Sequence, residues 1–295
     1  MATSTPAISW KNYLTLCKPN VVLEMLFTAA VGMLLAVPGL PPLDKLVYGI
    51  VGIALSASSA AAINQFIDRK ADAEMARTKQ RPLPKGHLTA TNVLSFALLL
   101  GISSMVLLIV KVNVLTALLT FLSLFGYAIV YTLYLKRATP QNIVIGGAFG
   151  ATPPLLGWCA ISNSIHPYAL LLVLIIFVWT PPHFWALAIA RREEYAKVNI
   201  PMLPVTHGSD FTRLQILLYT VLLLIVTLLP YLTGMSGLIY LAAALPLGLI
   251  FIGLAILMMR KKDNKTAMQT FAYSIIYITL LFAILLVDHY FFITL

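Results

Sequence analysis

The sequence predicts an all-α polytopic membrane protein with nine transmembrane helices. Of its 295 residues, 60% are hydrophobic and only 10% are charged, whereas about one quarter of the residues in soluble domains are charged. The apolar residues form long continuous runs, unlike the alternating pattern of a transmembrane β-barrel. The two cysteines are too few for a disulfide framework. A soluble enzyme, a membrane barrel and a disulfide scaffold are therefore excluded.

Each predicted helix is an apolar run long enough to cross the hydrocarbon core, which takes about 20 residues. In chain order, the runs centre on 21–37, 46–66, 92–110, 114–134, 142–160, 168–190, 212–232, 238–258 and 268–290. The first run is short and contains Glu24, and the fifth is rich in glycine and contains Pro153 and Pro154. Counts of seven or eight spans therefore stay open beside nine.

The distribution of lysine and arginine predicts the orientation, because cytoplasmic segments of membrane proteins carry an excess of both. With nine helices and the N-terminus inside, 18 of the 20 basic residues lie on the inner side, and only Lys45 and Lys111 lie outside. This bias predicts an N-in, C-out topology and favours the count of nine. The net charge of +10 then reflects topology and an anionic substrate, and no nucleic acid partner is expected.

Two long inner segments, 67–91 and 191–211, follow the second and the sixth predicted helices. Helices four apart in the chain run parallel, which suggests a duplicated four-helix unit with one additional helix. We interpret residues 1–295 as a single integral membrane domain. Its chemistry is expected at these two inner-face loops, since functional residues concentrate on loops that a rigid scaffold positions.

Half of the ten carboxylates lie in two clusters at the inner ends of these helices. In the first cluster Asn64, Asp68 and Asp72 are four residues apart, and each step advances only about 40° around a helix. A helix that continues through this segment therefore presents a ladder of oxygen ligands on one face. The second cluster contains Glu193 and Glu194.

Basic residues accompany both acidic clusters. In the first segment they are Arg69, Lys70, Arg77, Lys79 and Arg81. Mg²⁺ prefers a few carboxylates completed by water and substrate phosphate, and arginine and lysine bind the remaining phosphate oxygens. The pattern favours a metal–diphosphate substrate. The competing interpretation is a solvated helix end whose acids and bases pair with one another.

The segment 64–72 (NQFIDRKAD) and its continuation 75–84 (MARTKQRPLP) resemble the N-x-x-x-D-x-x-x-D motif region of the UbiA-type intramembrane prenyltransferases. The segments 136–147 (KRATPQNIVIGG), 181–187 (PPHFWAL) and 201–205 (PMLPV) are similar to the branch of that family that farnesylates heme. The resemblance extends over nearly the whole chain, and its motifs are long and specific.

The resemblance implies nine helices around a central cavity that opens toward the lipid. It implies that farnesyl diphosphate binds with Mg²⁺ at the inner-face loops and that its farnesyl group is transferred to a vinyl carbon of heme b. Water adds in the same conversion, which gives heme O for a terminal oxidase, directly or through a heme A synthase. The expected location is the inner membrane of a bacterium, with the active-site loops in the cytoplasm.

The resemblance also assigns roles to individual residues. Expected metal ligands are Asp68, Asp72, Glu193 and Glu194. Asn64 is expected to orient the diphosphate or a metal-bound water. Expected diphosphate-binding residues are Arg77, Arg81, Lys136 and Arg137. The aromatic residues Tyr127, Tyr131, Phe184 and Trp185 are either cation-stabilising faces or members of an interfacial belt.

The second acidic motif departs from the family pattern. Where the family has Asp-Asp-Tyr or Glu-Asp-Tyr, this chain has Glu193, Glu194 and Tyr195. Which of the two glutamates binds the metal therefore stays open. Where the family has glycine before Ile200, this chain has Asn199. Asparagine adopts left-handed backbone more readily than most residues, so a turn is expected there.

His183 is a candidate heme-binding residue. It lies eight residues before Arg191, which is about 12 Å into the bilayer along a helix, and ionisable residues at that depth are by default functional. Pro181 and Pro182 precede it and free backbone carbonyls, which is tolerated only where a helix faces protein or a cavity. The imidazole would ligate heme iron or move a proton, and the alternative is a histidine hydrogen-bonded within the bundle.

Three other functions compete with this interpretation. A transporter or channel fits the broken helices, but its charges should line a path through the midplane rather than collect on one face. A prenyltransferase of quinone or chlorophyll synthesis shares the diphosphate motif, and only the segments 181–187 and 201–205 argue against it. A non-catalytic assembly factor is the weakest of the three.

Overall fold

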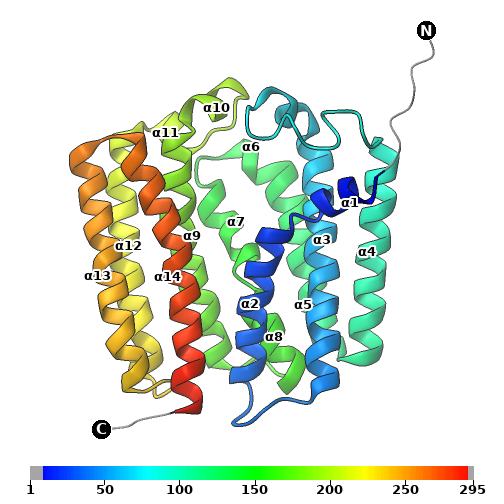
Figure 1. Cartoon of the computed structure of the whole chain (residues 1–295), viewed down its shortest axis with the longest axis vertical. Coiled ribbons are helices and arrows are strands. Elements are labelled where there is room, and N and C mark those ends of the chain that lie inside the picture. The colour runs from blue at the N-terminus through cyan, green and yellow to red at the C-terminus, as the bar shows by residue number, and fades with distance from the viewer. Residues whose placement is uncertain (1–8, 292–295) are drawn as a thin grey trace.

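The computed structural model describes residues 9–291, and within this range the regular structure is entirely helical. Eight of its helical spans are long and apolar enough to cross a membrane, and the bent pair α1 (Trp10–Leu16) and α2 (Pro19–Leu35) supplies a ninth. Figure 1 shows the spans packed side by side with their axes roughly parallel. The predicted all-α fold with nine spans is therefore confirmed for the described residues.

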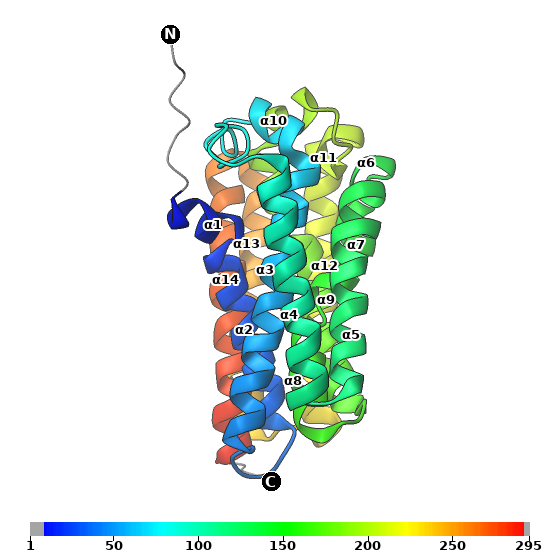
Figure 2. The same cartoon turned by 90° about the vertical axis from the view of Figure 1, so that its right-hand side faces the viewer.

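The remaining spans follow the predicted runs closely. They are α3 (Leu43–Glu74), α4 (Ala90–Lys111), α5 (Val114–Phe125) continued by η1 (Gly126–Leu135) and α6 (Lys136–Ala138), α7 (Asn142–Gly150) with α8 (Pro153–Ser162), α9 (Pro167–Ala190), α12 (Ser209–Leu232), α13 (Leu238–Lys261) and α14 (Asn264–Tyr290). Two short helices, α10 (Arg192–Lys197) and α11 (Leu203–Thr206), lie between α9 and α12. They lie at the same end of the bundle as α6 (Figures 1 and 2).

Two of the spans are broken where the sequence contains proline. The axes of α1 and α2 differ by 52°, and Lys18 between them has a left-handed backbone with φ of 49°. The fifth span breaks between α7 and α8, and Pro153 and Pro154 open α8, where proline's missing N–H removes no hydrogen bond. The glycine-rich, proline-containing run that the sequence shows in this span therefore corresponds to an interruption of the helix.

The inner loops are shorter and more ordered than the sequence suggests. Helix α3 continues to Glu74 and α4 begins at Ala90, so the first loop is confined to residues 75–89 instead of 67–91. The second loop, 191–211, contains α10 and α11, and α12 already begins at Ser209. Both changes bring polar residues onto helices, which fixes their direction.

Close helix contacts build the centre of the bundle. A β-carbon placed on Gly32 of α2 would lie 2.1 Å from the carbonyl oxygen of Pro154, and one placed on Gly157 of α8 would lie 1.9 Å from that of Ala29. Only glycine allows two backbones to approach so closely. Helices α3 and α4 are joined by hydrogen bonds of 2.7 Å from the Ser59 hydroxyl to the Ala97 carbonyl oxygen and from the Ser104 hydroxyl to that of Gly52.

The outer faces of the helices present an apolar surface. Exposed large apolar side chains include Leu98, Leu99, Ile102, Val106, Leu118, Leu218, Leu222, Ile225, Leu249 and Ile250. A soluble protein rarely exposes such a continuous surface, whereas lipid covers it without cost. The chain is accordingly an integral, multi-pass membrane protein. The central cavity that the resemblance implies stays a prediction.

Candidate active site

The inner end of α3 carries the three residues of the predicted ladder. Asn64, Asp68 and Asp72 are 4%, 2% and 4% exposed, and because α3 runs unbroken to Glu74, all three point to one side of the helix. The Asn64 amide donates a 3.2 Å hydrogen bond to Oδ2 of Asp68. The three residues therefore form one buried polar row.

Positively charged side chains cover this row. Nζ of Lys136 lies 2.5 Å from Oδ2 of Asp68, and Nη1 of Arg81 lies 2.5 Å from Oδ2 of Asp72. A guanidinium nitrogen of Arg137 lies 3.8 Å from the second oxygen of Asp68. Each of the two buried carboxylates thus has at least one cationic partner, as a charged group removed from water requires.

Asn64 also receives a cation from the break between α1 and α2. Nζ of Lys18 donates a 2.8 Å hydrogen bond to Oδ1 of Asn64, and Nδ2 of Asn64 donates a 3.2 Å bond to the hydroxyl of Thr132. Lysine can only donate and a carboxylate can only accept, so these partners fix the orientation of the Asn64 amide. The left-handed backbone at Lys18 directs its side chain toward α3.

A π-helical segment supplies the opposite wall. In η1 the Thr132 hydroxyl donates a 2.8 Å hydrogen bond to the Tyr127 carbonyl, five residues earlier, and the rings of Tyr127 and Tyr131 are 5.5 Å apart. A β-carbon on Gly146 would lie 2.2 Å from the Tyr131 ring, so this glycine makes room for the tyrosine. Such π-helical turns are frequent at functional sites. Lys136 follows η1 directly.

The second acidic cluster lies on α10. Glu194 accepts a 2.9 Å hydrogen bond from Arg191 through Oε1, and its Oε2 is buried with no hydrogen-bond partner among residues 9–291. Glu193 is exposed. The short helix therefore presents Glu194, and not Glu193, to the protein interior.

Tyr195 marks where the two loops meet. It packs with Met75, Ile200 and Met202 in one apolar cluster, so residues from the first loop and the second share a core. Burial raises the pKa of Tyr195, and the nearby Arg77 opposes this rise. Asn199 has a φ of 54°, so the turn expected at this position is present.

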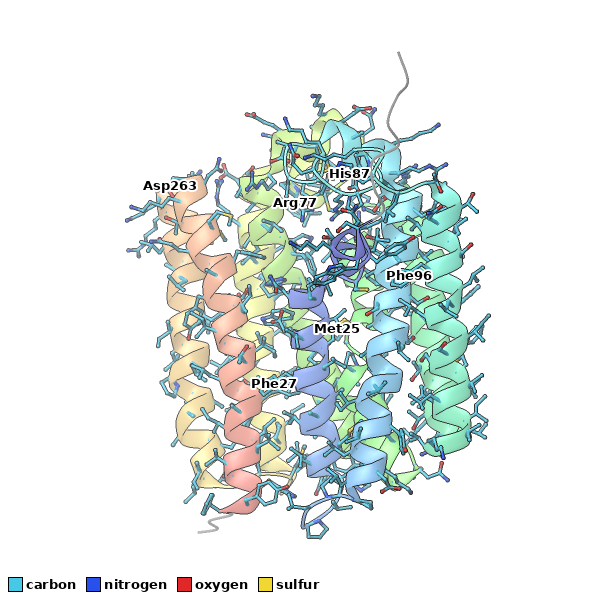
Figure 3. The ribbon with its side chains drawn as sticks, turned by 45° about the vertical axis from the view of Figure 1, so that its right-hand side comes forward. Met25, Phe27, Arg77, His87, Phe96 and Asp263 are labelled. Carbon is cyan, nitrogen blue, oxygen red and sulfur yellow. The ribbon has the colours of Figure 1, made fainter. Side chains whose placement is uncertain are left out.

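Figure 3 shows Arg77 at the same end of the bundle as His87 and Asp263, above Met25 and Phe27 of α2. Arg77 is exposed and forms no ion pair with any described residue, unlike Arg81 and Lys136. The structure thus brings together Asn64, Asp68, Asp72, Arg81, Lys136 and Arg137, places Arg77 and Glu194 in the adjoining loops, and leaves Glu193 outside.

Two contributors to the site, Lys18 and Thr132, were not predicted from the sequence. Lys18 is one of the 18 basic residues that indicate the inner side, and its position directly before Pro19 at the start of a span is a local signal of a break. Thr132 sits inside an apolar run, and nothing in its surroundings signals its contact with Asn64.

The donor set fits a hard cation that shares its coordination with a substrate. Oδ1 of Asp68 and Oε2 of Glu194 are buried carboxylate oxygens without hydrogen bonds in the described range. No three His, Cys, Asp or Glu side chains among residues 9–291 lie close enough to enclose a metal ion. Mg²⁺ is usually held by one or two carboxylates, with water and phosphate completing the shell. The site therefore suits a metal that arrives with phosphate.

His183 lies in α9 beneath this site, between Pro182 and Phe184. It is 7% exposed, its Nδ1 lies 2.7 Å from the hydroxyl of Ser274 on α14, and its ring stacks with Trp179 and Phe271. Phe184 is 41% exposed, whereas Trp185 is buried against Tyr219. These two aromatic residues therefore do not form a common face with the Tyr127–Tyr131 pair.

Known proteins resemble this chain over almost its full length. Protoheme IX farnesyltransferase of Methylococcus capsulatus is 65% identical over 283 residues, which are 96% of this chain and 95% of that protein. The protein of the same name from Nitrosococcus oceani is 58% identical over 282 residues, 96% and 94% of the two chains.

Solved structures share the fold. A structure described as that of a digeranylgeranylglyceryl phosphate synthase has a TM-score of 0.79 at 19% identity and covers 95% of this chain and 98% of its own. A UbiA homolog from Archaeoglobus fulgidus bound to GPP and Mg²⁺ has a TM-score of 0.65 at 17% identity, with 93% and 99% covered. The sequence pattern of the UbiA prenyltransferase family matches residues 25–286. The chain therefore belongs to the UbiA prenyltransferase family.

Proposed function

We propose that this chain transfers the farnesyl group of farnesyl diphosphate to a vinyl group of heme b, with addition of water, and releases heme O and diphosphate. Relatives that are 56–65% identical over nearly the whole chain are named protoheme IX farnesyltransferase. The observation that carries the proposal is the buried row of Asp68 and Asp72, paired with Lys136 and Arg81 at one end of an apolar bundle.

In this proposal the carboxylates of the site bind the metal, and the cations bind the diphosphate. Asp68 and Asp72 on α3 and Glu194 on α10 would each supply a carboxylate to Mg²⁺ that is bridged by the diphosphate, since no three such side chains among residues 9–291 enclose a metal by themselves. The exposed Glu193 is unsuited to this role. When bound, the metal supplies positive charge that stabilises the departing diphosphate. Solved UbiA homologs bound to GPP or DMAPP together with Mg²⁺ support this assignment.

The cations of the site complete the binding of the diphosphate. Lys136, Arg137 and Arg81 already surround the two aspartates, so they would bind phosphate oxygens once Asp68 and Asp72 hold a metal. Asn64 and Lys18 extend this polar surface toward α2. Arg77, exposed on the first loop, is placed to meet the diphosphate as it enters from the inner side.

The carbon chemistry requires a site from which water is excluded until the new bond has formed. The terminal vinyl carbon of heme b bonds to the first carbon of the farnesyl group as the bond from that carbon to the diphosphate oxygen breaks. Water then adds to the inner vinyl carbon and loses a proton, which gives the hydroxyl group of heme O. The half-buried Tyr127–Tyr131 pair precedes Lys136, the partner of Asp68, and would offer aromatic faces to the allylic cation.

His183 is our candidate for binding the iron of heme b. It is buried in the bilayer-embedded part of α9, its ring is held between helices by Ser274, and it lies on the side of the bundle where α9 packs against α14. An imidazole is a common axial ligand of heme iron. Iron ligation would fix the porphyrin, and hence its vinyl groups, relative to the diphosphate end.

The product indicates which proteins would act together with this enzyme. Heme O is used by terminal oxidases, so a heme A synthase or an oxidase assembly is the expected partner. The high identity to bacterial proteins favours the inner membrane of a bacterium, with the active-site loops in the cytoplasm as the positive charge on that side predicts.

The competing functions are not favoured. Membership in a prenyltransferase family argues against a transporter and against a non-catalytic assembly factor. A prenyltransferase of quinone or chlorophyll synthesis shares the fold, but the Methylococcus capsulatus and Nitrosococcus oceani relatives are both named for heme farnesylation.

The test uses purified full-length protein with heme b, farnesyl diphosphate and Mg²⁺, followed by chromatographic separation of the hemes. We expect heme O from the wild type and none from D68A or D72A, because each change removes a carboxylate and leaves an unpaired buried cation. E193Q is the matched control and should keep activity, whereas E194Q should lose it. Prenylation of 4-hydroxybenzoate without any heme O, while a related heme farnesyltransferase makes heme O in parallel, would reject the proposal.

A further inference from the structure

The hydrogen bonds around Ser274 determine which nitrogen of His183 carries the proton. Ser274 lies on α14, is fully buried, and has its hydroxyl oxygen 2.7 Å from Nδ1 of His183 on α9. The same hydroxyl lies 2.6 Å from the carbonyl oxygen of Phe271, one turn earlier on α14. A serine hydroxyl has a single hydrogen and a carbonyl oxygen can only accept. If this hydrogen pointed to Nδ1 instead, two oxygens would lie 2.6 Å apart with no proton between them, so the arrangement that makes both contacts hydrogen bonds directs it to Phe271.

It follows that Ser274 accepts a hydrogen bond from His183. Nδ1 must then carry the imidazole proton, and because a neutral imidazole has one N–H, Nε2 keeps its lone pair. Nε2 has no hydrogen-bond partner among residues 9–291, although all other polar atoms of the His183–Ser274 pair are engaged. The structure thus contains one basic nitrogen in the membrane interior that is not used within the fold.

The orientation of this ring is fixed on both faces. The imidazole stacks with Trp179 at 4.3 Å and with Phe271 at 4.6 Å between ring centroids. Trp179 is itself held by a 2.8 Å hydrogen bond from its indole nitrogen to the backbone carbonyl of Ser274. Ser274 therefore positions His183 through its side chain and the stacking partner of His183 through its backbone.

We propose that Ser274 is a positioning residue that holds His183 as the Nδ1–H tautomer so that Nε2 binds the iron of heme b. The proposal rests on the proposed function, in which heme b is the acceptor, and it names the ligating atom and its support. Histidines that bind metals usually donate the other ring N–H to a protein acceptor, and removal of that acceptor typically weakens metal binding 10- to 100-fold. Ser274 is the acceptor here.

The experiment measures binding of ferric heme b to the full-length protein without farnesyl diphosphate, by absorption and electron paramagnetic resonance spectroscopy. The wild type should show an imidazole-ligated heme, and H183A should lose this signature. S274A should raise the dissociation constant of heme about 10- to 100-fold and populate a second ligation state. S274T, which keeps the hydroxyl, should restore the wild-type spectrum.

Metal-free protoporphyrin IX and one further variant serve as controls. Protoporphyrin IX has no iron to ligate, so its affinity should be the same for the wild type, H183A and S274A. T279A removes an exposed hydroxyl that bonds only within α14, and it should leave heme binding unchanged. Equal losses of heme and protoporphyrin affinity in S274A would show that Ser274 shapes the pocket only, and would overturn the proposal.

The outcomes separate this proposal from the proposed function. If the wild type makes heme O while H183A and S274A keep the wild-type heme spectrum, the positioning role is wrong and the enzyme assignment stands. If S274A alone keeps that spectrum, His183 remains the ligand and Ser274 is not its support. If the wild type neither binds heme b nor makes heme O, the proposed function itself fails.

Discussion

At the scale of single residues, Asn64 shows why an amide rather than a third carboxylate begins the ladder on α3. Its oxygen accepts from Lys18 while its nitrogen donates to Asp68 and to Thr132. A carboxylate in this place would accept from Lys18 but would repel Asp68 and could not donate to it. The amide therefore links a cation and an anion without adding charge.

We expect N64D to impair binding of farnesyl diphosphate more than N264D. The first change places a like charge beside Asp68 in a buried position, where a hydrogen bond to a charged group is worth about 1.5–3 kcal/mol, so the KM for farnesyl diphosphate should rise at least tenfold. Asn264 is exposed at the start of α14 on the same side of the bundle, and N264D should have no effect. Steady-state kinetics of heme O formation measure the difference, and equal KM values would contradict the role of Asn64.

A second expectation concerns Lys18. K18M removes the ammonium group that bonds to Asn64 but keeps a long side chain at the same left-handed position, so the backbone strain is unchanged. Binding of farnesyl diphosphate should weaken about tenfold, as expected for a lost charge-assisted contact. K11M, on the exposed side of α1, is the control. Isothermal titration of the purified proteins tests this, and matching affinities would place Lys18 outside the substrate site.

The sequence predicted the geometry of only those site residues that lie within one helix. The spacing of Asn64, Asp68 and Asp72 predicted their common face, and α3 places them there. Lys18 and Thr132 reach Asn64 across 46 and 68 positions, and no local pattern reveals contacts that depend on how separate helices are packed. The exposure of Glu193 likewise depends on the start of α10 at Arg192, which the run of charges alone did not indicate.

At the scale of elements, the interrupted helices are what give the bundle its polar interior. Helix η1 widens the turn between Tyr127 and Thr132, α1 and α2 bend at Lys18, and α7 and α8 separate at Ala151. The sequence indicated the last of these through its glycines and prolines. It did not indicate η1, because residues 126–135 contain neither proline nor a polar cluster.

The crossing of α2 and α8 gives a stability prediction. G32A and G157A each force a methyl group to about 2 Å from a carbonyl oxygen, and overpacking typically costs about 1–3 kcal/mol or more. Both variants should lower the midpoint of thermal unfolding in detergent by several degrees. G253A, in open space within α13, should be neutral or slightly stabilising because alanine favours the helix. A G157A variant as stable as G253A would show that the helices can separate without loss.

At the scale of the whole molecule, the two ends of the bundle differ in their charged residues. The loop 75–89 and helices α6, α10 and α11 share one end of the bundle (Figures 1 and 2). At the opposite end Asp288 is fully buried and accepts hydrogen bonds from the backbone N–H groups of Gly237 and Tyr240, which caps α13. The apolar runs and the distribution of basic residues together predicted the count of spans. They did not predict the tilt of the helices or which helices pack together, because an apolar run does not specify its neighbours.

The predicted N-in, C-out orientation is testable with single cysteines in a C17S/C159S background. L40C lies in the turn between α2 and α3, and K79C lies in the loop after α3, both exposed. In intact bacterial cells a membrane-impermeant maleimide should label L40C at once, and K79C only after permeabilisation. The reverse pattern would invert the topology and move the diphosphate site to the outer face.

The pairing of Asp68 with Lys136 and of Asp72 with Arg81 has a consequence for the energy of substrate entry. Before substrate arrives, each anion already has a cation beside it. If a diphosphate binds together with Mg²⁺ as proposed, Asp68 and Asp72 would contact the metal, and Lys136 and Arg81 would contact the phosphate oxygens. Binding would then exchange the partners of two ion pairs, so neither carboxylate would be left without a positive partner in the low-dielectric interior. Release of the diphosphate with its metal would restore the pairs of Asp68 with Lys136 and of Asp72 with Arg81.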